Sequence, residues 1–254
     1  MSLTSKVALV TGGSRGIGRA IAQRLAQDGA LVVVHYGHNE EAARQTVDDI
    51  ESNRGAAFAV QADLAEVAQI EQLYQTLDGE LRQRTGSNQF DILVNNAGVS
   101  GLSPYDQMTS EQFDGLFAVN VRGAFFVTQL AIPRLRDGGR IINISSDASK
   151  GASPPISVAY SMSKAALDAF TLSLAANLGK CQITANTIAP GATATEMNAA
   201  MFDKPEVRQH LSDMTALGRV GTPTDIANAV ALLASADSGW ITGQYIVASG
   251  GLRL

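Results

Sequence analysis

The sequence predicts an α/β protein with one domain, residues 1–254, built on a doubly wound parallel sheet with helices on both faces. Short apolar, β-branched segments alternate with segments of helical periodicity along the whole chain. The first strand leads directly into a glycine-rich turn and a helix. No linker-like or low-complexity stretch interrupts the pattern, and 254 residues suit one large domain. Alternation of this kind forms a parallel sheet that is covered on both faces.

The expected elements follow from apolar periodicity and from residues that stop helices. Strands are expected at residues 7–10, 30–36, 56–61, 90–94, 140–144, 183–188 and 245–247. Helices are expected from residue 17 to a stop at Gly29, and at 40–53, 67–84, 110–136, 158–178 and 224–235.

The first strand ends in the segment TGGSRGIG, residues 11–18. Its glycines Gly12, Gly16 and Gly18 allow a tight turn and let the backbone approach a ligand closely. The helix that follows offers unpaired N–H groups and a partial positive charge to a diphosphate. A plain strand-to-helix turn needs only one glycine, so the segment predicts a nucleotide-binding turn.

The tip of the second strand bears on which dinucleotide is bound. A NAD site usually places an Asp or Glu there, where the carboxylate binds the ribose 2′-hydroxyl. Here the strand ends at Tyr36, and the first carboxylate after it is Glu40. Arg15, in the glycine turn, supplies a cation that matches a 2′-phosphate. The sequence therefore favours NADP over NAD.

Two later strand ends carry further candidates for cofactor binding. Asp63 and Leu64 follow the third strand, where the Asp63 carboxylate is expected either to contact an adenine amino group or to cap the next helix. Asn96, Ala97 and Gly98 follow the fourth strand, and small residues there let a ribose lie against the backbone.

Tyr160 and Lys164 are four residues apart, so their side chains share one face of a helix. A free tyrosine has a pKa of about 10, and a neighbouring ammonium lowers that pKa by favouring the phenolate. The pair therefore predicts a proton donor or acceptor for a carbonyl or an alcohol. Asn120 lies inside an expected helix, where asparagine is unfavourable, so it is either an exposed accident or its amide has a function.

Composition argues against several other classes of protein. The net charge of −5, without a basic run, argues against a non-specific nucleic-acid binder. The single cysteine, Cys181, excludes an internal disulfide and is expected to be a buried structural thiol. The histidines form no ligand pattern, so no metal site is expected. Without a signal peptide or a run of about 18 apolar residues, we expect a cytoplasmic protein that binds no membrane.

Four motifs agree in order and spacing with the short-chain dehydrogenase/reductase family, which the chain resembles over nearly its whole length. They are residues 11–18, residues 95–98, a serine after the fifth strand, and the pair Tyr160 and Lys164. Residues 190–197, PGATATEM, are also similar to the family's PGxxxTxM segment. The resemblance implies a Rossmann-type sheet of about seven strands, a nicotinamide cofactor, and hydride transfer between an alcohol and a carbonyl.

The resemblance also implies roles for single residues. Tyr160 resembles the catalytic acid/base, and Lys164 resembles the residue that binds the nicotinamide ribose and lowers the pKa of the tyrosine. Ser146, in preference to Ser145, resembles the hydroxyl that binds the substrate oxygen. Asn120 resembles the asparagine that holds a water in a proton relay to Lys164. The residues expected to contact the cofactor are Gly12, Ser14, Arg15, Gly16, Ile17, Gly18, Tyr36, Asp63, Leu64, Asn96, Ala97, Gly98, Tyr160, Lys164, Pro190, Gly191, Thr193 and Thr195.

The function expected from this set is reduction of a carbonyl, a 3-oxoacyl group or a related ketone, by NADPH, as in the 3-oxoacyl-acyl-carrier-protein reductases that the chain resembles. The alternatives are an NAD-linked dehydrogenase of a sugar, polyol or steroid alcohol, and a nucleotide-binding regulator without turnover. An enoyl reductase fits less well, because those relatives space tyrosine and lysine more widely than Tyr160 and Lys164.

Two surfaces carry expectations about substrate and assembly. Residues 197–217 are rich in Met, Leu and Phe, and are expected either to form a lid over an apolar substrate or to pack as helices on the core. The helices that begin near Ser110 and Val158 are apolar on more than one face. Family members are commonly tetramers built through these helices, so a homotetramer that binds a small-molecule substrate is expected.

Overall fold

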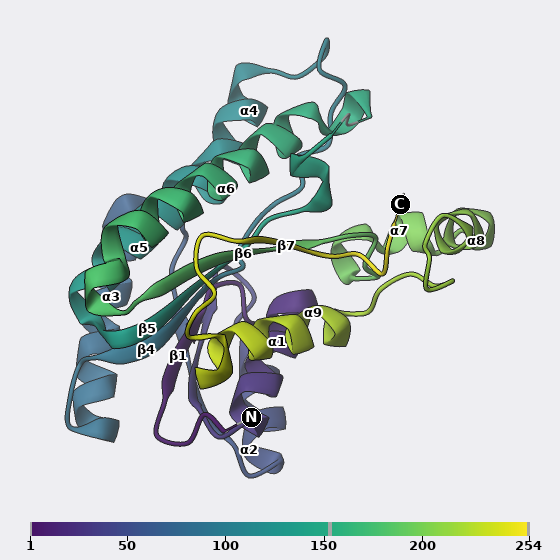
Figure 1. The fold of residues 1–254 in the computed structure, drawn as a ribbon. Coiled ribbons are helices and arrows are strands. Elements are labelled where there is room, and N and C mark those ends of the chain that lie inside the picture. Colours follow the sequence, from purple (N-terminus) through teal and green to yellow (C-terminus); the bar gives the residue numbers. More distant parts are fainter. Residues whose placement is uncertain (1, 152–153, 253–254) are drawn as a thin grey trace.

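The computed structural model describes residues 2–151 and 154–252 (Figure 1). In this part of the chain the centre is one sheet of seven parallel strands in the order β3-β2-β1-β4-β5-β6-β7. The strands are β1 (Val7–Val10), β2 (Leu31–Tyr36), β3 (Ala56–Gln61), β4 (Phe90–Asn95), β5 (Leu135–Ile144), β6 (Thr184–Pro190) and β7 (Tyr245–Ala248). The strand order reverses between β1 and β4, and α/β sheets bind ligands beyond the carboxyl ends of the strands at such a point.

Helices cover both faces of the sheet, each over its own hydrophobic core (Figure 1). On one face lie α1 (Gly16–Gln27), α2 (Glu40–Ser52) and α9 (Pro223–Ala234), and on the other lie α3 (Val67–Thr85), α4 (Ser110–Phe117), α5 (Ala124–Ala131) and α6 (Val158–Leu178). Every residue of β1 is buried, because the strand lies at the centre of the sheet with helices above and below it. The predicted fold class is confirmed.

The single helix expected at residues 110–136 is divided, and this corrects the sequence prediction. Between α4 and α5 the chain forms a π-helix over Ala118–Gly123, and after α5 a 3₁₀ turn that contains Pro133. Strand β5 then starts at Leu135 rather than at residue 140, because Leu135 is buried and pairs with Phe90 of β4. Proline disfavours helix at the residue before it, which helps to end the helical run there.

The helical run Ser110–Arg134 is the one helix in the described chain that is long and apolar enough to cross a membrane by length and composition. This corrects the expectation that no such run exists. A core helix of a sheet protein passes the same test, and Leu116 and Val127 of this run are buried in the protein.

Cys181 is exposed, so the expectation of a buried thiol is wrong. The residue ends a 3₁₀ turn, Gly179–Cys181, that connects α6 to β6 at the surface. The apolar neighbours that suggested burial belong to the strand that starts at Thr184.

The segment expected to be a lid contains two short helices, α7 (Ala199–Phe202) and α8 (Pro205–Asp213), which project beyond the sheet near the C-terminus (Figure 1). No residue of α8 is buried, so this helix does not pack on the core. Met197 and Leu217, at the two ends of the segment, are exposed.

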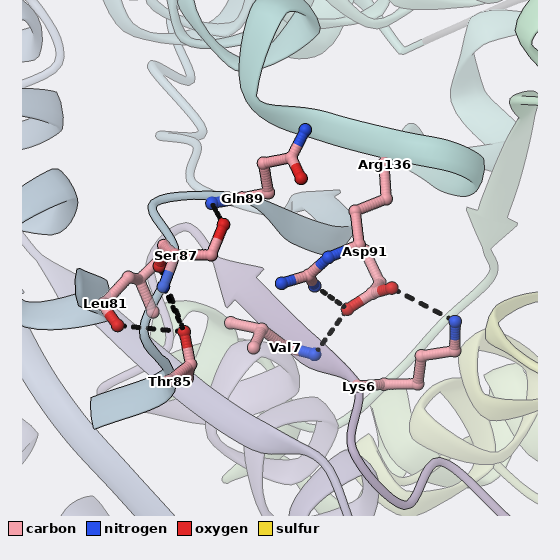
Figure 2. A network of polar contacts seen from close by, with 8 residues as sticks. All are labelled: Lys6, Val7, Leu81, Thr85, Ser87, Gln89, Asp91 and Arg136. Carbon is pink, nitrogen blue, oxygen red and sulfur yellow. Dashed lines mark hydrogen bonds and ion pairs between the residues drawn. The ribbon is translucent and has the colours of Figure 1, made fainter. Parts of the chain in front are cut away.

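Asp91 of β4 joins three strands at the amino edge of the sheet (Figure 2). Its buried carboxylate accepts hydrogen bonds from Lys6 Nζ at 3.0 Å, from the Val7 N–H at 2.9 Å and from Arg136 Nη1 at 2.7 Å. Lys6 and Val7 stand at the start of β1, and Arg136 lies in β5. Asp91 therefore holds the ends of β1, β4 and β5 together on the side opposite the glycine turn.

Candidate active site

The glycine turn lies at the carboxyl edge of β1 and packs against the end of β4. Gly12 has φ of 62°, a backbone conformation that L side chains rarely adopt. Its N–H donates to Nδ1 of His35, 3.1 Å away, and Nε2 of the same ring lies 3.0 Å from the Ala62 carbonyl. A Cβ placed on Gly18 would lie 2.1 Å from the Gly12 carbonyl oxygen, so only glycine allows this close approach. The turn is thus built around backbone, with no side chain at its centre.

The N-terminus of α1 fits a diphosphate. The helix begins at Gly16 after Arg15, which provides no side-chain cap, and no acidic residue occupies the first turn. The unpaired N–H groups and the helix dipole therefore stay available to an anion. Ser14 is buried, and its carbonyl accepts hydrogen bonds from Arg19 and Thr46, which fix the turn in place.

The end of β4 is tied to the same turn. Thr11 Oγ1 accepts from the N–H groups of Asn96 at 2.9 Å and Ala97 at 3.0 Å. Asn96 Nδ2 donates back to the carbonyls of Thr11 at 2.8 Å and Gly12 at 3.2 Å. These bonds bring the first and third predicted motifs together at the reversal of strand order.

The groups expected to select the dinucleotide surround the tip of β2. Arg15 is exposed beside the turn, and Tyr36 ends the strand half-buried. Asp63 is not the cap of α3, because that helix begins after Glu66. Its carboxylate accepts from the Ala65 N–H at 2.9 Å and lies 3.9 Å from His38, so it stabilises the turn after β3. The helix-cap alternative is therefore wrong, and the adenine contact stays a prediction.

Residues 190–195 close the edge from the side of β6. Pro190 ends that strand, and a Cβ on Gly191 would lie 2.5 Å from Ser249 Cβ, so the loop after β7 packs directly on it. Thr193 Oγ1 donates to the Gly191 carbonyl at 3.0 Å. The side chain of Thr195 faces Gly16, from which a Cβ would be 3.7 Å away.

Tyr160, Lys164 and Ser146 meet where β5 and α6 face the turn. The Ser146 hydroxyl is hydrogen-bonded to the Tyr160 phenol. Lys164 is buried, its Nζ donates to the Ile144 carbonyl at 2.9 Å, and Nζ lies 5.8 Å from the Tyr160 ring centroid. Ser145 is occupied differently, because its hydroxyl donates to the Lys164 carbonyl at 3.1 Å. The geometry thus brings Ser146, and not Ser145, to the phenol.

The pKa values of the pair differ from the expectation. Burial raises the pKa of Tyr160 above its ordinary value, the hydrogen bond with Ser146 acts in the lowering direction, and the charge of Asp147 adds to the increase. Lys164 does not lower the pKa of the tyrosine in this structure, because its ammonium is turned to the Ile144 carbonyl. Burial lowers the pKa of Lys164 itself to about 8, while the charge of Asp168 acts to raise it.

Asn120 is buried in the π-helix, so it is not an exposed accident. Its Oδ1 accepts from the Val99 N–H at 2.8 Å, and its Nδ2 donates to the Val99 carbonyl and to Ser163 Oγ, both at 3.0 Å. Ser163 in turn donates to the Tyr160 carbonyl at 2.7 Å. The amide therefore fixes the loop after β4 relative to the catalytic helix, and a role in a water relay stays a prediction.

Sequence reasoning missed three residues that position the site. They are His35 under Gly12, Ser163 between Asn120 and Tyr160, and Asp168 one helical turn after Lys164. Ser163 and Asp168 lie at helical spacing from Tyr160 and Lys164, so that spacing was the one available signal. For His35 the sequence held no signal, because its partner Gly12 is in another element.

An α/β sheet that gathers a glycine turn and a buried tyrosine–lysine pair at one edge is the architecture of a nicotinamide-dependent oxidoreductase. Residues 12–253 match a family model described as enoyl-(acyl carrier protein) reductase. The chain belongs to the short-chain dehydrogenase/reductase family and is an NAD(P)-dependent oxidoreductase.

Individual relatives cover the chain from end to end. The hydroxynaphthalene reductase-like protein Arp2 of Metarhizium guizhouense is 42% identical, over 98% of this chain and 96% of that protein. LugOII, a promiscuous reductase that catalyses keto-reduction at C1 during lugdunomycin biosynthesis, is 47% identical with a TM-score of 0.95, over 100% of this chain and 99% of its own. The angucycline C-6 ketoreductase LanV with bound NADP is 47% identical with a TM-score of 0.94, over 99% and 97%.

Proposed function

We propose that this protein is an NADPH-dependent ketoreductase that reduces a ring ketone of a fused-ring compound to the alcohol. The observation that carries the proposal is the Ser146 hydroxyl bonded to the Tyr160 phenol beside the buried Lys164. The names of relatives more than 40% identical support ketone reduction, and one of them refers to a naphthalene, a fused pair of rings. The 3-oxoacyl substrate expected from the sequence becomes the comparison substrate.

The chain's own groups divide the work of proton transfer. Bound NADPH supplies the hydride for the carbonyl carbon. Ser146 donates a hydrogen bond to the carbonyl oxygen and holds it within reach of the Tyr160 phenol, which gives that oxygen its proton. The raised pKa of Tyr160 keeps the phenol protonated and ready to donate. Lys164, beside the Ala97–Gly98 backbone, binds the ribose and stabilises the phenolate that remains.

The mouth of the site suits an apolar substrate. Val99, whose N–H is held by Asn120, has an exposed apolar side chain, as does Ile156 in the loop before α6. The two loops are joined by a hydrogen bond of 3.0 Å from the Ser103 N–H to the Ile156 carbonyl. Met197 supplies a third exposed apolar side chain from the segment after Thr195. Apolar side chains from three segments favour a flat, apolar ketone over a sugar or polyol.

The test is consumption of NADPH with α-tetralone, a bicyclic ketone, against ethyl 3-oxobutanoate as the linear β-keto ester. We expect the bicyclic ketone to have the higher kcat/KM, and Tyr160→Phe to lower kcat by about 10²–10⁴-fold. Tyr74→Phe is the matched control, because its phenol donates to the Val127 carbonyl on the far side of the sheet. Preference for the linear ester would refute the ring-ketone substrate, and preference for polyols with NAD would refute the reductase.

The cofactor preference has its own test. Arg15 is the exposed cation at the turn, and no carboxylate ends β2. We expect Arg15→Ala to raise the Kd for NADPH by about tenfold, the loss of one charge-assisted contact, and to leave the Kd for NADH nearly unchanged. Calorimetric titration measures both constants. A wild type that binds NADH more tightly than NADPH would overturn the assignment.

The proposed assembly is a homotetramer. Of the apolar residues on the two long helical segments, Leu116, Leu167 and Leu174 face the core, whereas Phe125 of α5 and Leu172 of α6 are exposed. Exposed apolar side chains on two neighbouring helices support a contact with another subunit. Light scattering at micromolar concentration tests the proposal, and a monomer there would refute it. Phe125→Glu with Leu172→Glu is expected to give a smaller species.

A further inference from the structure

A line of oxygen atoms connects α6 to the loop that carries Ser146. Oδ2 of Asp168 lies 2.6 Å from Ser149 Oγ. Ser149 Oγ lies 3.1 Å from the Tyr245 hydroxyl of β7. The Tyr245 hydroxyl lies 3.0 Å from the backbone carbonyl oxygen of Ser146. Three elements therefore meet in one chain of hydrogen bonds that ends on the peptide of the catalytic serine.

The number of protons in this chain can be counted. A carbonyl oxygen only accepts, so the one hydroxyl proton of Tyr245 is used on Ser146. The contact between Ser149 and Tyr245 must then use the one hydroxyl proton of Ser149. Nothing is left on Ser149 for the contact of 2.6 Å with Asp168, so that contact needs a proton on the carboxyl group. An ionised Asp168 would leave three contacts with two protons.

The second oxygen of Asp168 agrees with this count. Oδ1 is buried and has no hydrogen-bond partner among the described residues. Ser145, which stands beside the carboxyl, donates instead to the Lys164 carbonyl. A carboxylate buried with an unpaired oxygen is costly, whereas the carbonyl oxygen of a neutral acid tolerates it better.

The charges around Asp168 oppose one another. Burial raises the pKa of Asp168, and the hydrogen bonds from Ser149 and Ser145 and the charges of Lys150 and Lys164 act to lower it. Lys150 also lies over the Tyr245 ring, with Nζ 3.7 Å from its centroid, and Asp147 faces Tyr245 from the same loop. The remaining titratable group at the site, Tyr160, touches Ser146 and not Asp168.

We propose that Asp168 is a positioning residue that acts as a neutral carboxylic acid, donating its proton to Ser149 so that the chain through Tyr245 holds the Ser146 peptide for the proposed ketone reduction. The inference rests on the proposed function for its effect on rate, and on the geometry alone for the protonation state. The amide of asparagine donates from the same position, so Asp168→Asn preserves the chain, whereas Asp168→Ala removes it.

Steady-state kinetics of these variants with NADPH and α-tetralone test the role. We expect Asp168→Ala and Tyr245→Phe to lower kcat by about tenfold, equivalent to about 1.4 kcal/mol, with the KM for NADPH nearly unchanged. Asp168→Asn is expected to restore at least half of the wild-type kcat and to keep the pH profile. If Asp168 were an anion that supports Lys164, Asp168→Asn would lower the pKa of Lys164 further and shift the basic limb to lower pH. Such a shift, or a loss equal to that of Asp168→Ala, would overturn the proposal.

Infrared spectroscopy tests the proton without turnover. We expect the wild type at pH 7 to show the carbonyl band of a protonated carboxyl group that is missing from the spectrum of Asp168→Asn. Asp48→Asn is the control, because Asp48 is exposed on α2. Identical spectra of wild type and Asp168→Asn at this band would refute the neutral acid, even if the ketone is reduced as proposed. Absence of turnover together with the band would refute the proposed function and leave the protonation state established.

Discussion

Two buried carboxyl groups stand at opposite edges of the same sheet and are held differently. Asp91, at the amino edge, accepts from two cations and one backbone N–H (Figure 2). Asp168, at the carboxyl edge, is bonded to one serine hydroxyl, and its second oxygen has no partner among the described residues. One carboxylate is neutralised by fixed cations, and the other group is left close to a change of protonation.

The comparison separates stability from function along the strands. At the amino edge, each polar group of the Asp91 cluster is paired, as expected for an interaction that only holds strands together. At the carboxyl edge, Lys164 is buried against a carbonyl and Tyr160 has a raised pKa, and both conditions cost free energy. Changes at the two edges are therefore expected to have opposite effects on activity and on stability.

The largest expected effect comes from Lys164→Met, which keeps the length of the side chain and removes its charge. We expect kcat to fall by about 10²–10⁴-fold, while the free energy of unfolding does not decrease, because a buried cation is replaced by an apolar chain. Ketone reduction and urea unfolding at pH 7 measure the two effects.

The pH dependence of stability provides the control for that variant. The pKa of Lys164 is lowered from 10.5 to about 8 in the folded protein, so its cost is fully present below pH 8 and is relieved as the pH rises towards 10.5. Wild type minus Lys164→Met should therefore become more favourable over that interval. A constant difference, or a strongly destabilised variant, would contradict the assignment of Lys164 to the costly edge.

Asp91→Asn is expected to have the opposite result. It leaves Arg136 and Lys6 without their anion, and breaking a buried ion pair costs about 3 kcal/mol where the cations keep some solvent contact. The kcat of the folded enzyme should stay unchanged, because the cluster is on the edge away from the site. Glu80→Gln, which breaks an exposed pair with Arg84, is the control and should cost less than about 1 kcal/mol.

His35 tests whether the carboxyl edge also contributes to stability. Burial lowers the pKa of His35 from 6.5 to about 4, and the Gly12 N–H needs the unprotonated Nδ1 as its acceptor. The stabilisation is therefore present above pH 6.5 and is lost as the pH falls towards 4, by about 3 kcal/mol at most. Urea unfolding of wild type and His35→Asn between pH 7 and 4 measures it, and parallel curves would contradict it.

Lys6→Met should have the smallest effect. The Lys6 side chain is 49% exposed, and Asp91 keeps Arg136 and the Val7 N–H as partners. A loss of less than about 1 kcal/mol is expected, as for other exposed pairs. A loss as large as that of Asp91→Asn would mean that Lys6, and not Arg136, neutralises the carboxylate.

The sequence was sufficient for the features that depend on local patterns. The glycine turn, the strand ends and the Tyr160–Lys164 spacing are written in consecutive residues, and the structure places them at one edge. The direction of the Lys164 ammonium was not predictable, because its partner Ile144 belongs to another strand. The same limit applies to the Asp168 chain, whose members lie up to 99 residues apart.

The division of the helical run at Asn120 shows a different limit. A π-helix holds one more residue per turn than the apolar pattern suggests, and it becomes evident only when Asn120 is seen to bond the Val99 backbone. The extended β5 was missed for a related reason. Its first residues are anchored by Leu135 pairing with Phe90, ahead of Gly138, whose φ is 78°.

The π-helix over Ala118–Gly123 also couples the catalytic centre to the outer surface of the protein. Deleting one residue there would restore a regular α-helix and turn everything downstream by about 100° around the helix axis. Phe125 would then leave the solvent-facing side, and Val127 would leave the core. One additional residue in a single turn thus sets both the position of the Asn120 amide and the side chains that a neighbouring subunit would meet, so insertions and deletions in this turn should change activity and assembly together.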